Sequence, residues 1–169
     1  MMLDPVNFKI SQAEVKDVVD FLCEIPQHLN PDTISFHNYR GEEVVTGSFE
    51  NLKVSVSRWQ VRFGDGSLCK FAFGDNFHTM VRADVKRAIE KLSDSLHIPV
   101  SQAEVTRLDI AENLIVRQPP QVYFNHLGMM ENAKRLPHPE GLYYSKRAKI
   151  LCFYDKVREQ KSKGEPIPE

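Results

Sequence analysis

The run YDK at 154–156, followed by Glu159, places a phenol, an ammonium and two carboxylates at the end of an apolar stretch. A tyrosine hydroxyl can attack phosphorus when a divalent cation polarises the phosphate and a nearby cation favours the phenolate. This chemistry makes Tyr154 a candidate nucleophile. Tyr143 and Tyr144, on the preceding predicted strand, are rivals. Packing at the edge of the core is the alternative role for each of these tyrosines.

A second pair of charges lies within the apolar segment 105–116 (VTRLDIAENLIV). Its alternation predicts a mostly buried strand, on which Arg107 and Asp109 share a face. An unpaired carboxylate on such a strand costs several kcal/mol, so Asp109 must pair with Arg107 or bind a metal. The residue types leave both possibilities open. Carboxylate oxygens suit Mg²⁺ or Mn²⁺.

Other familiar chemistries are absent from the sequence. It has no G-x-x-x-x-G-K-[ST], no G-x-S-x-G and no H-E-x-x-H. The six histidines never occur as H-x-H, and the three cysteines form no C-x-x-C pair. These absences argue against a nucleotide-hydrolysing, serine-hydrolase or zinc-dependent reaction.

The net charge of −1 is an average over unlike segments. Residues 1–132 carry 13 basic and 18 acidic side chains, residues 133–163 carry nine basic and three acidic ones, and the last six residues carry two acids. The basic segment surrounds Tyr154, and its local excess of positive charge can attract the phosphates of a nucleic acid although the total charge is near zero. Trp59, Tyr123 or Phe124 could stack on an unpaired base, with core packing as the alternative for each. The candidate DNA contacts are Arg107, Lys146, Arg147, Lys149 and Arg158.

The elements that must position these groups alternate between helical and strand patterns. Strand patterns occur at 6–10, 44–49, 52–63, 68–73 and 105–116, and as two strands of 141–154 about a turn at Lys146–Arg147. Within them we expect a bulge near Ser57–Arg58 and a hairpin turn at Asp65-Gly66. Helical patterns occur at 14–25 (capped by Ser11 with Glu14 and ended by Pro26), 79–97, 121–127 and 155–164. The order predicts an α+β fold, an antiparallel sheet of hairpins with helices packed on one face.

With 169 residues and 41% apolar content, the chain has globular composition. We expect one domain over 1–163 and a linker at 164–169. No apolar run is long enough to span a membrane, and the N-terminus does not resemble a signal peptide, so we expect a cytoplasmic protein with reduced thiols.

Three motifs occur in the order typical of one family: GSLCKFAFGDN (66–76), VTRLDIAEN (105–113) and FYDKVRE (153–159). The chain resembles the replication proteins of filamentous phages and related mobile elements, the gene II/gene X or CRI family. These are similar to the rolling-circle initiators of plasmids. The resemblance implies an endonuclease that nicks and rejoins one strand of origin DNA with Mg²⁺ or Mn²⁺. Its implied partners are origin DNA, a host helicase and a polymerase.

The resemblance also assigns roles to residues. The family's R-x-D strand falls on Arg107 and Asp109, which implies that Asp109 is a metal ligand. The tyrosine of its Y-[DN]-K motif falls on Tyr154, the implied nucleophile. Lys156 would steady the phosphate or phenolate, and Glu159 would add a ligand or act as a base.

The sequence departs from the family pattern in two places. Family members continue further, with another carboxylate-bearing strand and a second domain, so we expect a fragment with an incomplete metal site. Asn113 stands where plasmid initiators often have a second acid, although Glu112 is adjacent. Two alternatives to a nicking domain therefore remain: a DNA-binding or regulatory module of the same fold, and a scaffold domain with no nucleic-acid partner.

Overall fold

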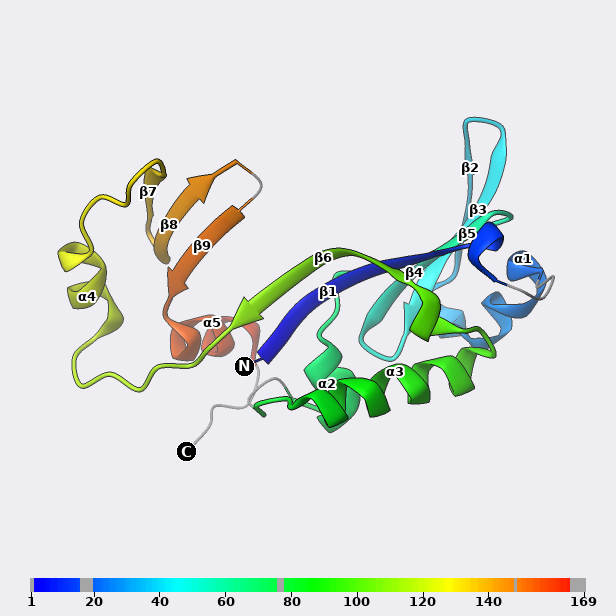
Figure 1. The fold of residues 1–169 in the computed structure, drawn as a ribbon, viewed down its shortest axis with the longest axis horizontal. Helices are drawn as coiled ribbons and strands as arrows, with labels where there is room; N and C mark the ends of the chain where they lie inside the picture. The colour runs from blue at the N-terminus through cyan, green and yellow to red at the C-terminus, as the bar shows by residue number, and fades with distance from the viewer. Residues whose placement is uncertain (1, 16–19, 76–77, 148, 165–169) are drawn as a thin grey trace. The chain divides into compact units, whose positions relative to one another are not determined.

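The computed structural model describes residues 2–15, 20–75, 78–147 and 149–164 (Figure 1). The chain divides into two compact units, Met1–Glu112 and Asn113–Glu169. Among the described residues, the first unit contains a six-stranded sheet and the second a three-stranded sheet, and every strand pair is antiparallel. The predicted α+β class is confirmed.

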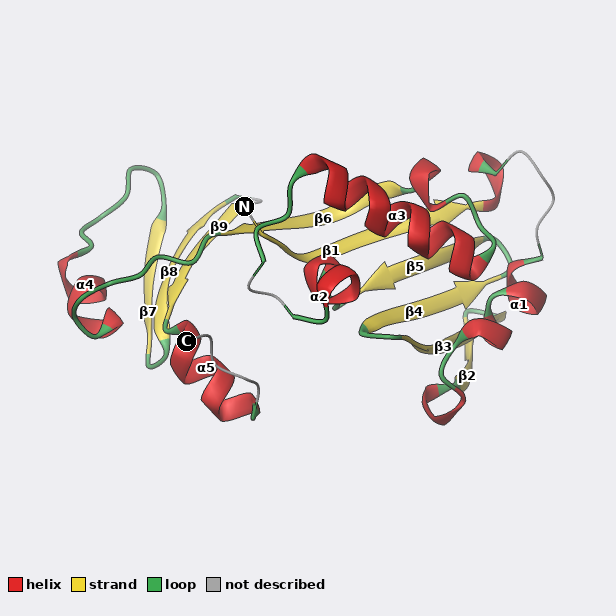
Figure 2. Ribbon diagram, turned by 90° about the horizontal axis from the view of Figure 1, so that it is seen from below, coloured by secondary structure: helices red, strands yellow, loops and turns green. Residues whose placement is uncertain are grey.

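The sheet of the first unit has the strand order β2-β3-β4-β5-β1-β6. The strands are β1 (Met2–Ser11), β2 (Ser35–Tyr39), β3 (Glu42–Phe49), β4 (Leu52–Ser57), β5 (Gln60–Gly64) and β6 (Glu104–Ala111). The helices are α1 (Phe21–Glu24), α2 (Leu68–Phe73) and α3 (Arg82–Leu96), with short 3-10 helices at Gln12–Glu14, Pro26–His28, Pro31–Thr33 and Val100–Gln102. Figure 2 shows α2 and α3 against one face of this sheet.

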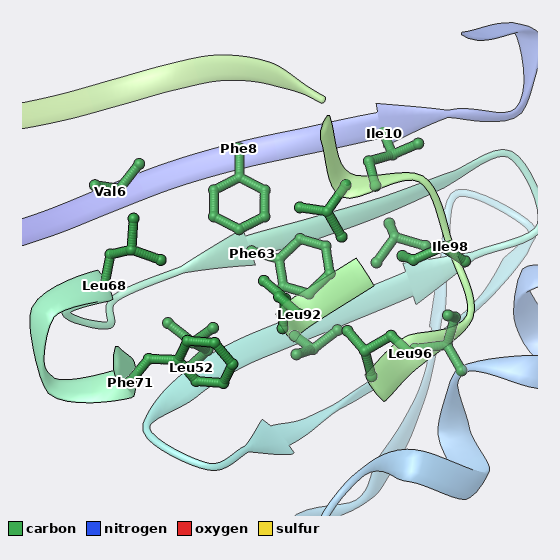
Figure 3. Packing of buried hydrophobic residues seen from close by; sticks show 14 of the residues in the cluster. Val6, Phe8, Ile10, Leu52, Phe63, Leu68, Phe71, Leu92, Leu96 and Ile98 are labelled. Atoms are coloured by element: carbon green, nitrogen blue, oxygen red, sulfur yellow. The ribbon is translucent and has the colours of Figure 1, made fainter. Parts of the chain in front are cut away.

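The core of the first unit lies between that face and the helices. Cross-strand partners point to the same side of a sheet, and the paired residues Val45, Val56, Val61 and Ile10 are all buried. The ring centroids of Phe8 and Phe63 stack 4.6 Å apart. Leu92 and Leu96 of α3 complete the same cluster, as Figure 3 shows. The predicted helix at 79–97 is confirmed, because its apolar stripe has a buried sheet face to cover.

The segment 68–73 is a helix, so the predicted strand there is wrong. The Ser67 side chain accepts a hydrogen bond from the Lys70 N–H and caps α2. Gly66 precedes this cap. A side chain does not fit at this position, because a Cβ on Gly66 would lie 2.7 Å from the Asn51 carbonyl oxygen. The run Asp65-Gly66 therefore begins a helix rather than closing a hairpin, although its turn chemistry fits both.

Two further local predictions are wrong. Ser11 is the last residue of β1, and the described helix α1 is capped by Asp20, whose carboxylate accepts from the Leu22 N–H. Residues 16–19 of the predicted helix lie outside the described residues. The change of apolar phase at Ser57–Arg58 is a turn between β4 and β5 rather than a bulge. Trp59 sits in this turn and is exposed.

The second unit is built on β7 (Lys134–His138), β8 (Gly141–Lys146) and β9 (Lys149–Tyr154), in that order. The strand β7 was not predicted. Helices α4 (Pro120–His126) and α5 (Lys156–Lys163) flank the sheet in the sequence. The predicted turn at Lys146–Arg147 is confirmed, and Arg147 adopts a left-handed conformation (φ 49°) there. The helix after Tyr154 is confirmed too, because Asp155 caps it by accepting from the Arg158 N–H.

Candidate functional site

Arg107 and Asp109 form the pair that their spacing allows. The Arg107 Nε and Nη2 atoms donate to the two Asp109 carboxylate oxygens over 2.9 and 2.6 Å. This bidentate hydrogen bonding is the first cause of a raised pKa for Arg107. Both carboxylate oxygens thus already accept from a cation. The Arg107 guanidinium, predicted to contact DNA, is engaged in the same pair.

The strand that carries this pair is not buried, which corrects the sequence-based expectation. The side chains of Arg107 and Asp109 are 55% and 37% exposed, and Leu108 and Ile110 on the other face are exposed as well. The reason is the position of β6 at the edge of the sheet, where it pairs with β1 alone among the described strands. Alternating apolar residues show which side chains share a face of a strand. They do not show whether the strand lies at the edge or in the middle of its sheet, and this position decides how exposed the strand is.

The predicted metal ligands do not form a ready coordination shell. Within the described residues, no group of three or more His, Cys, Asp or Glu side chains is close enough to hold one ion. Glu159 accepts from Lys156 Nζ over 2.9 Å and also from Lys163, so its oxygens are engaged much as those of Asp109 are. A small hard cation takes about six oxygen ligands, several of which can be water. In the arrangement described, cationic side chains already occupy the carboxylates of Asp109 and Glu159, so neither presents a ready site for a divalent ion.

Tyr154 is the last residue of β9, directly before the cap of α5. It is 41% exposed, and the Lys156 Nζ lies 5.8 Å from its ring centroid. Burial raises the pKa of Glu159, but hydrogen bonds from Lys163 and Lys156 outweigh burial and leave that pKa below its ordinary value. Glu159 is therefore ionised at neutral pH and holds Lys156 near the tyrosine, which makes it a weak candidate for a base.

The rival tyrosines lie in different surroundings. Tyr144 is 5% exposed, and its hydroxyl donates to the Gly128 carbonyl oxygen. Tyr143 is half-buried, and its pKa is raised chiefly by a hydrogen bond with the Cys152 thiol. A buried donor and a phenol with a raised pKa are both poorer nucleophiles than an exposed tyrosine beside a cation.

The basic segment borders the same sheet. Lys146 of β8 and Lys149 of β9 are cross-strand neighbours at the end of the hairpin, and Arg147 lies in the turn that joins the two strands. All three are exposed, and none makes an ion pair with a carboxylate in the described part of the chain. Arg158 is also exposed, on the first turn of α5. The structure thus brings these four predicted DNA contacts into the unit that contains Tyr154.

Sequence reasoning missed Gly141, which shapes this site. Gly141 pairs with Tyr154 across the sheet, and a Cβ there would lie 2.3 Å from the Phe153 carbonyl oxygen and 3.2 Å from the Tyr154 Cβ. The signal available in the sequence is a glycine at the start of an alternating apolar strand, a position that often marks close backbone approach.

Trp59, Tyr123 and Phe124 were predicted as possible stacking residues. Tyr123 is exposed and accepts from the Gln118 N–H, and Phe124 presents its carbonyl oxygen to Arg135.

Comparison with known proteins supplies the family. The family model for the N-terminal region of the gene II type replication-associated protein matches residues 2–169, nearly the entire chain. The chain belongs to this family. The resemblance drawn from the three ordered motifs is therefore confirmed, and the family implies initiation of rolling-circle replication at origin DNA. No curated protein and no solved structure matches the chain. Among the described residues, no helix has the length and apolar character needed to cross a bilayer.

Proposed function

We propose that the protein nicks one strand of its replication origin and rejoins it, with Tyr154 as the nucleophile. The observation that carries this proposal is the exposed Tyr154 phenol at a strand end beside Lys156, within a basic unit of a replication-initiator family member. The Tyr154 Oη attacks the phosphorus, the bond from phosphorus to the 3′-oxygen breaks, and that oxygen leaves with a proton as a free 3′-hydroxyl. The phenol proton passes to solvent.

The covalent step conserves the energy of the broken bond. The 5′-phosphate stays on Tyr154 as a phosphodiester, so a 3′-hydroxyl can attack it and reseal the strand without ATP. This agrees with the missing phosphate-binding loop. Lys156 stabilises the negative charge that passes between the phenolate and the phosphate, and Glu159 fixes the position of Lys156 through their ion pair.

Dependence on Mg²⁺ or Mn²⁺ stays a proposal from the family resemblance. Asp109 and Glu159, each taken by itself, are the candidate ligands, and each would have to exchange its ion pair for the ion. No step above is assigned to an ion, because Arg107 engages Asp109 and two lysines engage Glu159. The partnership with a host helicase and polymerase is likewise proposed from the family resemblance.

Supercoiled origin DNA, labelled and incubated with the protein and Mn²⁺, tests the nucleophile. The wild-type chain should carry label through a denaturing gel, and Tyr154→Phe should not. Tyr143→Phe and Tyr144→Phe are matched controls that remove one hydroxyl from the same unit and should keep the adduct. An adduct on Tyr154→Phe that is lost in Tyr143→Phe would transfer the role to Tyr143.

A second candidate function is a DNA-binding or regulatory module that occupies the origin without cutting it. The ion-paired state of Asp109 favours this candidate. It predicts salt-sensitive binding that Asp109→Ala leaves unchanged, together with no adduct in any variant. Replacing Lys146, Arg147 and Lys149 by alanine should lower the slope of log affinity against log salt by about 0.9 per lost phosphate contact.

A further inference from the structure

The two edges of the six-stranded sheet in the first unit are unlike. The edge strand β2 has five residues and carries no Lys, Arg, Asp or Glu, whereas the edge strand β6 has eight residues. Figure 2 shows β6 along the border of the sheet, and β1 is its one neighbour among the described strands. The outward N–H and C=O groups of a long edge strand can pair with a further strand.

The strand β6 lacks the features that usually prevent such pairing. Proline and lysine are common on protected edges, and β6 contains neither. Its charges Arg107 and Asp109 neutralise each other through their ion pair. The extra residue that β6 carries against β1 is Thr106, so the stretch 107–111 follows after this irregularity. The edge is therefore open to a partner strand along 107–111.

This stretch exposes apolar side chains on one face and charges on the other. Leu108 lies opposite the buried Val6, so it belongs to the face that carries the core, and Ile110 shares that face. Leu108 is nevertheless 49% exposed and Ile110 is 64% exposed. A strand added beside β6 would cover part of both side chains, which gives the pairing an apolar contribution.

The charges on the other face are complementary to themselves. When two copies of a strand pair antiparallel about a two-fold axis, opposite residues are equally far from the axis and share a face. An axis at Arg107 would set two guanidinium groups against each other, and an axis at Asp109 would set two carboxylates against each other. With the axis at Leu108, each Arg107 lies opposite Asp109 of the second copy. Like charges directly opposite destabilise a strand pair, so the charges select this register.

The same register matches the apolar face. Leu108 meets Leu108 of the second copy at the axis, with Cβ atoms about 4.5–5.5 Å apart, and each Ile110 is a diagonal neighbour of the other Leu108. The axis is perpendicular to the sheet, so the helices of both copies cover the same face of one continuous sheet. Charge and apolar contacts thus agree on a single arrangement.

We propose that β6 pairs antiparallel with β6 of a second copy of this chain, with Leu108 at the two-fold axis. Backbone hydrogen bonds and the Leu108 contact supply the affinity, and the two Arg107–Asp109 pairs fix the register. The proposal goes beyond the proposed function, because it concerns assembly and does not involve Tyr154.

Sedimentation velocity of the full chain over a series of concentrations tests the proposal. The wild type should approach twice the monomer mass of 19.5 kDa as its concentration rises. Leu108→Lys sets two ammonium groups against each other at the axis and should raise the dissociation constant by about tenfold or more. Phe36→Lys is the matched control, because it also replaces an exposed apolar side chain on an edge strand of this sheet, and it should keep the wild-type mass.

A charge reversal tests the register. Arg107→Asp alone sets carboxylates against carboxylates and should leave a monomer, whereas Arg107→Asp combined with Asp109→Arg restores opposite charges and should restore the dimer. Circular dichroism checks that each variant is folded. A wild type that stays monomeric at its highest soluble concentration would overturn the proposal and leave the edge to a strand of a different protein. A dimer that persists in Leu108→Lys would place the interface elsewhere, and a folded double variant that stays monomeric would overturn the register.

Discussion

Replacing Gly141 by alanine should disturb the end of β9 that carries Tyr154. The new Cβ would lie 2.3 Å from the Phe153 carbonyl oxygen, whereas a carbon and an oxygen in ordinary contact are about 3.3 Å apart. The two strands must therefore separate by about 1 Å at this point. The obstructing atom belongs to the backbone, so no rotation of a side chain can relieve the clash.

The expected cost follows from that displacement. Overpacking of this kind typically costs about 1–3 kcal/mol of the free energy of unfolding. A shift of about 1 Å in a reacting group can lower a rate by about 100-fold. Urea unfolding followed by circular dichroism measures the first effect, and the rate of adduct formation on origin DNA measures the second.

Gly128 provides the matched control for this substitution. An alanine Cβ at Gly128 would meet nothing within 4 Å, and Gly128→Ala should change the free energy of unfolding by less than about 0.5 kcal/mol. If Gly141→Ala matches Gly128→Ala in both stability and adduct rate, the close approach of β8 and β9 does not position Tyr154 and the reasoning fails.

Three other predictions concern the ion pairs and the cap. Because the pKa of Glu159 is depressed in the folded chain, its contribution to stability is present above the ordinary value of 4.5 and is lost as the pH falls through the folded pKa. Thermal melts of Glu159→Gln at several pH values should lack this loss of stability at acidic pH. A melting temperature that falls with pH in parallel in the variant and the wild type would contradict the assignment. Arg107→Ala should cost less than about 1 kcal/mol, because its pair with Asp109 is largely exposed, and a loss above about 3 kcal/mol in urea unfolding would mean a buried pair. Ser67→Ala should cost about 1 kcal/mol in the same assay by removing the cap of α2, whereas no change would argue against the helix at 68–73.

The local sequence pattern predicted an element correctly where contacts within one short segment determine that element. The helix α3 follows from its apolar period, and the hairpin of β8 and β9 follows from two alternating runs about a polar turn. Asp155 caps α5 through a contact three residues away. The motifs GSLCKFAFGDN, VTRLDIAEN and FYDKVRE, in that order, carried the family assignment, which the match over residues 2–169 confirms.

Local pattern failed where distant residues decide the outcome. The segment 68–73 alternates well enough for a strand, yet it is a helix. Ser67 caps this helix, and its buried Leu68, Cys69 and Phe71 belong to the same core cluster as Leu52 of the sheet. The five residues of β7 show no strand pattern in the sequence, because Pro137 lowers strand propensity, although a proline fits an edge strand.

By itself, the sequence determined the fold class, the family, the basic segment around Tyr154 and the possibility of an Arg107–Asp109 pair, because composition, periodicity and short spacing are properties of neighbouring residues. Tertiary structure decided the exposure of β6, the burial of Tyr144 and the partial exposure of Tyr154. It also decided that Gly141 lies against the Phe153 backbone. Each of these depends on which strand or helix covers a residue, and that is fixed by contacts between residues far apart in the chain.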